Sequence, residues 1–313
     1  MTQSGISSCS NNTTFSEKLR NFRAAIQAGE FLITAEVSPP KGGDATEMLN
    51  MAKLLKDRVH AVNITDGSRA VMRMCPLAAS IMLLQQGIEP ICQVACRDRN
   101  RIGLQADLLG ANALGIHNIL ALTGDPVKAG DHIDAKSVFD MEGVRLLQMI
   151  KKLNLGVDWN GKKLTDGATD LFPGAAVDPQ SHSWSGLQRR FERKIQAGAE
   201  FFQSQLICDF DKLDKFMHQI AASSGKPILA GIFLIKSAKN ARFLNKNVPG
   251  IEISEEIINR LDRAKDPLQE GITIAAEQIQ MAQKICHGVH IMAIKREDLI
   301  PQILERAGIA KLK

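Results

Sequence analysis

Short apolar runs alternate with amphipathic stretches along almost the whole chain. Eight of these runs are rich in residues that favour strands, and most lack alternating polar positions. That pattern is typical of strands buried on both faces. The sequence therefore predicts strands over residues 31–39, 61–65, 89–96, 118–123, 171–177, 200–208, 227–235 and 288–294.

The stretches between these runs carry apolar residues at helical spacing. Met48, Ala52 and Leu55, for example, fall on one helical face. The step from Asp266 to Pro267 predicts the start of a helix that runs to about residue 287. Four glycines stand where a helix should stop before the next strand: Gly87, Gly115, Gly198 and Gly288.

Eight strand-then-helix units in one chain predict an α/β fold that is a single (β/α)8 TIM barrel. The alternative is a doubly wound sheet, which usually has a phosphate-binding glycine fingerprint after its first strand. Residues 38–43 do not match that fingerprint. The long polar connection over residues 154–170 is interpreted as a surface insertion. We expect a flexible tail over residues 1–15 and one catalytic domain over residues 16–313.

Composition excludes several classes of protein. The chain has 313 residues, 44% of them hydrophobic, and a net charge of +5 that is spread without a basic block, so the charge pattern argues against a nucleic-acid partner. No apolar run approaches the ~20 residues of a membrane helix. The six scattered cysteines and the lack of a secretory signal predict reduced thiols in a cytoplasmic protein. No His, Cys or carboxylate spacing indicates a metal site.

In such a barrel the active site lies at the carboxyl ends of the strands. Glu36 ends an apolar strand, where desolvation should raise the pKa of its carboxyl toward that of a general acid; an ion pair is the alternative. Asp125 follows a glycine and is interpreted as a ligand contact rather than a helix cap. The Gln205 amide would bind the edge of a ligand ring that carries both a hydrogen-bond donor and an acceptor. The alternative is a core amide whose hydrogen bonds are all made within the protein. The chain contains no Tyr, so phenolic acid catalysis is excluded.

Other polar residues near the strand ends support weaker hypotheses. Arg97, Arg99 and Arg101 place three guanidinium groups near the mouth, where they would hold phosphates or a polyanionic tail, or form a solvated loop. Lys236 is interpreted as a solvated lysine or anion contact rather than a Schiff-base lysine. His290 is interpreted as a core histidine.

Five motifs occur in order with sensible spacing: T-A-E-V-S-P-P, V-N-I-T-D-G, L-A-L-T-G-D, R-K-I-Q-A-G-A and F-F-Q-S-Q-L-I-C-D. Together they resemble methylenetetrahydrofolate reductase, over about residues 16–310. The resemblance implies a flavin enzyme that passes hydride from flavin N5 to 5,10-methylenetetrahydrofolate and yields 5-methyltetrahydrofolate. The alternative is a pterin-binding methyltransferase barrel without flavin.

The resemblance also implies roles for matching residues. Glu36 matches the acid that opens the folate ring, and Asp125 matches the aspartate between flavin and folate. Gln205 matches the glutamine that reads the pterin, and Gln203 on the same strand is a second candidate for substrate binding. The implied flavin contacts are Thr65, Gln93, Thr123, Asp125, Phe139, Asp178 and Lys194.

Several of these positions depart from the better-known bacterial enzymes, which carry Arg at Thr123, His at Gln93, and Tyr at Phe139 and Asp178. FAD is the implied cofactor, and these changes leave FMN open. Ala238 stands where those enzymes stack a Phe on NADH.

The chain looks most like the short catalytic subunits of acetogens and related anaerobes. That branch implies an electron-delivering partner subunit with zinc or iron–sulfur centres, and a homo-oligomer remains open. The polyglutamate tail of folate is the hypothetical ligand of the arginines at 97, 99 and 101.

Overall fold

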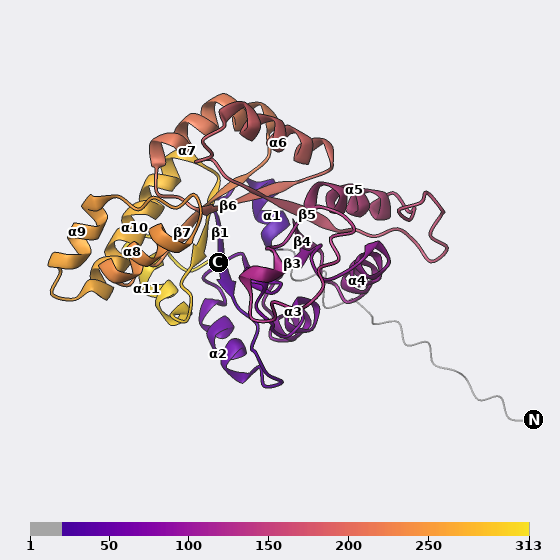
Figure 1. Ribbon diagram of the computed structural model, residues 1–313, viewed down its shortest axis with the longest axis horizontal. Helices are drawn as coiled ribbons and strands as arrows, with labels where there is room; N and C mark the ends of the chain where they lie inside the picture. Colours follow the sequence, from indigo (N-terminus) through magenta and orange to yellow (C-terminus); the bar gives the residue numbers. More distant parts are fainter. Residues whose placement is uncertain (1–20, 313) are drawn as a thin grey trace, which may run out of the picture.

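Parallel strands form a closed barrel in the part of the chain that the computed structural model describes, residues 21–312 (Figure 1). Each strand pairs with the next along the chain, and the last pairs with the first, so the predicted TIM barrel is confirmed. The predicted tail over residues 1–15 lies outside the described residues. The strands are β1 (Leu32–Val37), β2 (Ala61–Ile64), β3 (Pro90–Ala95), β4 (Asn118–Leu122), β5 (Phe172–Val177), β6 (Phe201–Leu206), β7 (Ile228–Phe233) and β8 (Gly288–Met292).

Helices surround these strands (Figure 1). The α-helices are α1 (Asn21–Ala28), α2 (Thr46–Leu55), α3 (Pro76–Gln85), α4 (Arg101–Ala113), α5 (Gly143–Asn154), α6 (Trp184–Gln196), α7 (Phe210–Phe216), α8 (Ala238–Asn247), α9 (Glu255–Arg263), α10 (Pro267–Ile285) and α11 (Ile300–Arg306). Shorter helices are η1 (Ser68–Ala70), η2 (Val127–Ala129), η3 (Met217–Ala221), η4 (Ala222–Ser224) and η5 (Glu297–Leu299). None of the helices within residues 21–312 combines the length and apolar character needed to cross a membrane.

Local capping explains where several helices begin and end. The Asp266 side chain accepts hydrogen bonds from the first backbone N–H groups of α10, which confirms the predicted start of that helix. Gly87, Gly115 and Gly198 adopt positive φ just after a helix, as predicted. Gly288 is different, because it is the first residue of β8. A Cβ atom there would lie 2.4 Å from the Leu32 carbonyl oxygen, so close strand packing requires this glycine.

An apolar cluster seals the amino-terminal end of the barrel. Phe22 of α1 packs edge-on against Phe201, with ring centroids 5.0 Å apart. The Glu89 carboxylate accepts hydrogen bonds from the Phe22 backbone N–H (3.0 Å) and from the Asn118 side-chain amide (2.7 Å). Helix α1 is therefore fixed beneath the strands, and the open end of the barrel is the carboxyl end. The other buried members of this cluster are Ala25, Leu32, Ala61, Ile91, Leu120 and Leu229.

The long polar connection lies between α5 and β5. It contains no helix or strand, apart from a single bridge between Val157 and Lys163. Loops that lead from a helix into a strand lie at the amino-terminal face of a (β/α)8 barrel, opposite the active-site face. The segment therefore adds surface away from the mouth.

A β-bulge on β6 is the main irregularity of the described barrel. The register between β6 and β7 shifts between Gln203 and Leu206, which turns the backbone carbonyl of Gln205 toward β7. A Cβ atom on Gly231 would lie 2.2 Å from that carbonyl oxygen. The bulge and the glycine opposite it are therefore mutually dependent, and they set the position of Gln205 at the mouth.

Replacing Gly231 with Ala should destabilise the barrel by about 1–3 kcal/mol, because the new methyl group overlaps backbone atoms that have no room to retreat. Denaturant unfolding of the purified protein measures this change. Gly43→Ala is the matched control, since a Cβ atom there meets nothing within 4 Å. Equal unfolding free energies for the two variants would contradict this account.

Candidate active site

Glu36 lies near the carboxyl end of β1 and has a side chain that is 17% exposed. Its Oε2 atom is 3.8 Å from Nε2 of His290, which lies on the neighbouring strand β8. Side chains two residues apart on a strand share a face, so Glu36 stands above Thr34 on the inner wall of the barrel. The predicted acid therefore lies at the mouth, next to a histidine.

A hydrogen-bonded polar layer crosses the barrel directly below Glu36. The side-chain amides of Asn63 and Gln203 pair reciprocally, at 2.7 and 3.1 Å, and Gln203 Nε2 also donates to Thr34 Oγ1 at 3.1 Å. Thr34 Oγ1 lies 3.0 Å from His290 Nδ1. All four residues are buried. Gln203 is thus engaged by protein partners, and its contact with substrate stays a prediction.

Gln205, two positions further along β6, has an exposed side chain at the mouth. Thr65, just after β2, is only 1% exposed, and its Oγ1 atom has no hydrogen-bond partner among the described residues. Gln93 on β3 is buried. A hydroxyl that is buried without a partner is costly, which makes Thr65 a natural contact for a polar ligand atom.

Asp125 follows β4 at an abrupt turn, where Gly124 has φ +94°. One carboxylate oxygen of Asp125 accepts a hydrogen bond from the Arg69 backbone N–H at 2.7 Å. Arg69 and Ala70 both have positive φ, an uncommon conformation for residues with side chains. The strained helix η1 therefore orients the carboxylate of Asp125 at the mouth.

Two further aspartates hold the loop between β4 and α5. Asp131 accepts hydrogen bonds from Lys41 Nζ (2.7 Å) and from the Met72 backbone N–H (2.9 Å), and these bonds lower the pKa of its carboxyl to about 2. Asp140 binds the Arg101 guanidinium through two hydrogen bonds. The loop is thereby tied to the loops that follow β1 and β2 and to the start of α4.

A cavity of about 260 Å³ opens between the ends of β4 and β5 and helices α5 and α6. Burial lowers the pKa of the Lys194 side chain, whose Nζ donates to the Ala176 carbonyl oxygen at 2.6 Å. Arg190 lowers that pKa further, and Glu142 opposes it. Excess positive charge beside the start of α5 favours an anion. The lining also includes Thr123, Gly143 and Arg193.

Phe139 and Asp178 lie near this region without lining the cavity. Phe139 adopts φ +39° in the loop that precedes α5. Asp178 follows β5 with an exposed side chain, and its Oδ1 accepts a hydrogen bond from the Gln180 backbone N–H at 3.1 Å. Their roles as flavin contacts stay predictions.

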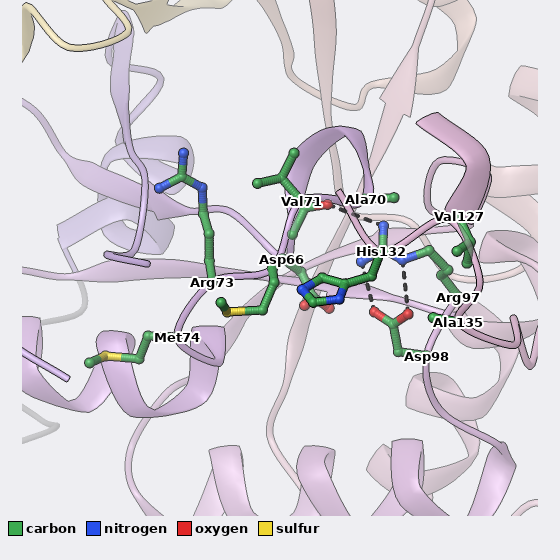
Figure 2. Close-up of a pocket in the computed structure, with 12 residues that line it drawn as sticks. Asp66, Ala70, Val71, Arg73, Met74, Arg97, Asp98, Val127, His132 and Ala135 are labelled. Atoms are coloured by element: carbon green, nitrogen blue, oxygen red, sulfur yellow. Dashed lines mark hydrogen bonds and ion pairs between the residues drawn. The ribbon is translucent and has the colours of Figure 1, made fainter. Parts of the chain in front are cut away.

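The three clustered arginines are paired with carboxylates rather than free. Figure 2 shows the Arg97 guanidinium turned toward Asp98, beside a cavity of about 400 Å³ formed by the loops after β2, β3 and β4. Because each positive charge is already neutralised, the cluster is a poor site for a polyanionic tail. The partners are Asp98 for Arg97, Asp66 and Asp107 for Arg99, and Asp140 for Arg101.

Sequence reasoning missed the residues that link strands across the barrel. Asn63 was a candidate only as one of the polar residues near the end of its strand, and Thr34 had no assigned role, although both lie at inward positions of their strands. Gln180 was also missed: it is buried, and its amide binds backbone groups of Leu206 and Cys208. The one available signal was strand alternation, which places Thr34 on the same face as Glu36.

Two chemical features complete the description. Within residues 21–312, no group of three or more His, Cys, Asp or Glu side chains is arranged to hold a metal ion. The described cysteines are all free thiols, and burial raises the pKa of Cys92 and Cys96 to about 12, so these two are poor nucleophiles.

The fold is similar to that of a solved protein from Clostridium thermocellum that binds two copies of 5-methyl-5,6,7,8-tetrahydrofolic acid. The TM-score is 0.62 at 15% sequence identity, and the match covers 91% of this chain and 97% of that one. At this level of identity the likeness concerns the fold alone.

Two eukaryotic relatives are similar in sequence. The chain is 25% identical to methylenetetrahydrofolate reductase 2 of Schizosaccharomyces pombe, over 91% of this chain and 46% of the relative. It is also 25% identical to a probable methylenetetrahydrofolate reductase (NADPH) of Caenorhabditis elegans, over 75% of this chain and 34% of the relative. The chain spans less than half of the length of each.

The family model for methylenetetrahydrofolate reductase matches residues 21–308, which include every strand of the barrel and the residues at its mouth. Because the match extends over nearly all of the described chain, the protein belongs to the methylenetetrahydrofolate reductase family.

Proposed function

We propose that the chain is the catalytic part of a flavin-dependent methylenetetrahydrofolate reductase. It would convert 5,10-methylenetetrahydrofolate to 5-methyltetrahydrofolate. The observation that carries the proposal is the position of Glu36, a partly buried carboxyl group at the barrel mouth of a member of this family. The solved neighbour that binds 5-methyltetrahydrofolic acid supports folate as the ligand class.

Glu36 would act as the general acid. Opening the five-membered ring of the substrate breaks a C–N bond, and the departing amine needs a proton, which a protonated Glu36 supplies. The cationic iminium that results is stabilised by the Asp125 carboxylate, which the Arg69 backbone N–H already orients. Gln205, exposed at the mouth, would pair with the pterin ring.

The described residues fit a flavin. Thr65 offers a buried hydroxyl without a protein partner, and the cavity beside Lys194 offers positive charge for a phosphate group. Bound flavin would supply the hydride that the iminium carbon accepts. The residues proposed to hold it are Thr65, Gln93, Thr123, Asp125, Phe139, Asp178 and Lys194. FAD is the proposed form, with FMN as the alternative.

We further propose that electrons arrive through a partner subunit that carries zinc or iron–sulfur centres, as in the short catalytic subunits that the chain resembles. Ala238 begins α8 and is 3% exposed, packed against the cluster that includes Leu206 and Ile235. A buried methyl group offers no surface on which a nicotinamide ring stacks.

Glu36→Gln should slow folate reduction by roughly 10²- to 10⁴-fold, because the amide cannot deliver a proton. Single-turnover mixing of the dithionite-reduced holoenzyme with 5,10-methylenetetrahydrofolate measures the step. Flavin content should stay the same, since Glu36 is not among the proposed flavin contacts. A variant as fast as the native enzyme would exclude Glu36 as the acid.

Lys194→Ala should weaken flavin binding by roughly tenfold or more, because a charge-assisted contact is lost. Flavin retained after gel filtration, with mass identification, measures binding and distinguishes FAD from FMN. Arg189→Ala is the matched control, since Arg189 is an exposed residue of α6 that does not line the cavity. A folded native chain that takes up no flavin would favour the methyltransferase alternative.

The purified chain alone should reduce methylenetetrahydrofolate with dithionite but only slowly with NADH or NADPH. Addition of the co-purifying partner should restore rapid turnover with the physiological donor. Full turnover of the isolated chain with either nucleotide would show that no partner is needed.

A further inference from the structure

We propose that His290 is a positioning residue for Glu36. It would present its Nε2–H group to the Glu36 carboxyl and stabilise the carboxylate that forms when the proton leaves. This inference rests on the proposed function, in which Glu36 is the general acid. It assigns a role to a side chain that sequence reasoning placed in the core.

In the structure, the two neighbouring amides pair reciprocally in one orientation. Asn63 Nδ2 donates to Gln203 Oε1, and Gln203 Nε2 donates to Asn63 Oδ1. The second proton on Gln203 Nε2 is then directed to Thr34 Oγ1, at 3.1 Å. The Thr34 hydroxyl therefore receives one hydrogen bond from the layer below Glu36 and retains one proton to donate.

That proton has two nearby acceptors. His290 Nδ1 lies 3.0 Å from Thr34 Oγ1, whereas the Val289 carbonyl oxygen lies 3.4 Å away. The shorter contact favours His290 Nδ1 as the acceptor. We therefore assign the neutral imidazole proton to Nε2, the nitrogen that faces Glu36.

The Nε2 atom of His290 and Oε2 of Glu36 are 3.8 Å apart, beyond hydrogen-bond range by roughly 0.6 Å. The proposed hydrogen bond therefore requires a side-chain rotation that brings the two atoms closer. His290 is 4% exposed and Glu36 is 17% exposed, so little water screens the contact. The electrostatic attraction between a Glu36 carboxylate and the imidazole N–H of His290 is consequently strong.

The proton step balances without a change in the charge of His290. The Glu36 O–H bond breaks as a new N–H bond forms on the substrate amine, and the electron pair of the ring C–N bond stays on that nitrogen. The carbon becomes the iminium cation, and Glu36 becomes a carboxylate. His290 keeps its proton throughout, and a proton from water later restores Glu36.

The elements packed around this pair bring one further titratable side chain. Glu297 of η5 is buried, and its pKa is raised first by burial and also by the charge of Glu36. Strands β2 and β7, which adjoin β1 and β8, carry no titratable side chain. Glu297→Gln therefore serves as the control for pH effects that do not involve His290.

Two isosteric variants separate donation to Glu36 from packing. His290→Gln keeps an amide donor near the position of Nε2 but loses the contact with Thr34. His290→Asn keeps an acceptor for Thr34 but loses the donor. We expect His290→Asn to slow single-turnover folate reduction roughly ten- to hundredfold, and His290→Gln to retain most of the rate. Thermal melting of both variants monitors folding.

The pH profile provides a readout that a packing role would not move. Without the donor the Glu36 carboxylate is less favourable, so the alkaline limb of the rate profile should shift upward by about one unit in His290→Asn. It should stay in place in His290→Gln. In Glu297→Gln it should move downward or not at all, because removing a nearby negative charge favours the carboxylate.

A double-mutant cycle decides the outcome. If His290 acts through Glu36, adding His290→Asn to Glu36→Gln should change the rate little. A further ten- to hundredfold loss in the double variant, or equal losses in the Asn and Gln variants, would overturn the inference while leaving the proposed function intact. Native activity of Glu36→Gln alone would instead overturn the proposed acid role.

Discussion

Closure of a parallel barrel is the constraint on which the rest of the structure depends. Alternate side chains of every strand must point inward, and any polar group placed there must find a partner away from water. The chain meets this requirement with an apolar seal around Phe22 and, above it, the layer of Thr34, Asn63, Gln203 and His290. Glu36 lies above that layer, so the carboxyl end of the barrel is built on a rigid set of hydrogen bonds.

At the mouth of the barrel, some charged side chains are paired with each other and others remain available to bind a ligand. The arginines at 97, 99 and 101 are paired with aspartates and brace the loops, while Lys194 and its neighbours leave positive charge beside α5. Asp125 is held by a strained backbone turn. The proposed acid role of Glu36 requires this separation, because bracing charges near its carboxyl group would alter its proton affinity.

Much of the fold was predictable, because strands, caps and turning glycines are decided within a few residues of the chain. All eight predicted strands form, and α10 begins at Pro267 after its cap Asp266, as expected. Gly288 was misjudged as a helix stop, since the contact that requires it lies with Leu32 on a strand far away in sequence. The candidate site was predictable as a list of residues at strand ends, on the strength of the family resemblance.

Which of those residues are free to act depends on partners that are distant in sequence. Gln203 resembles Gln205 locally, yet Asn63, 140 positions earlier, occupies its amide, while the bulge opposite Gly231 leaves Gln205 exposed. His290 approaches Glu36 only because β8 closes onto β1. Hydrophobic periodicity and capping are local properties that amino-acid order encodes directly. Hydrogen-bond saturation and charge pairing arise only when closure brings separate strands together.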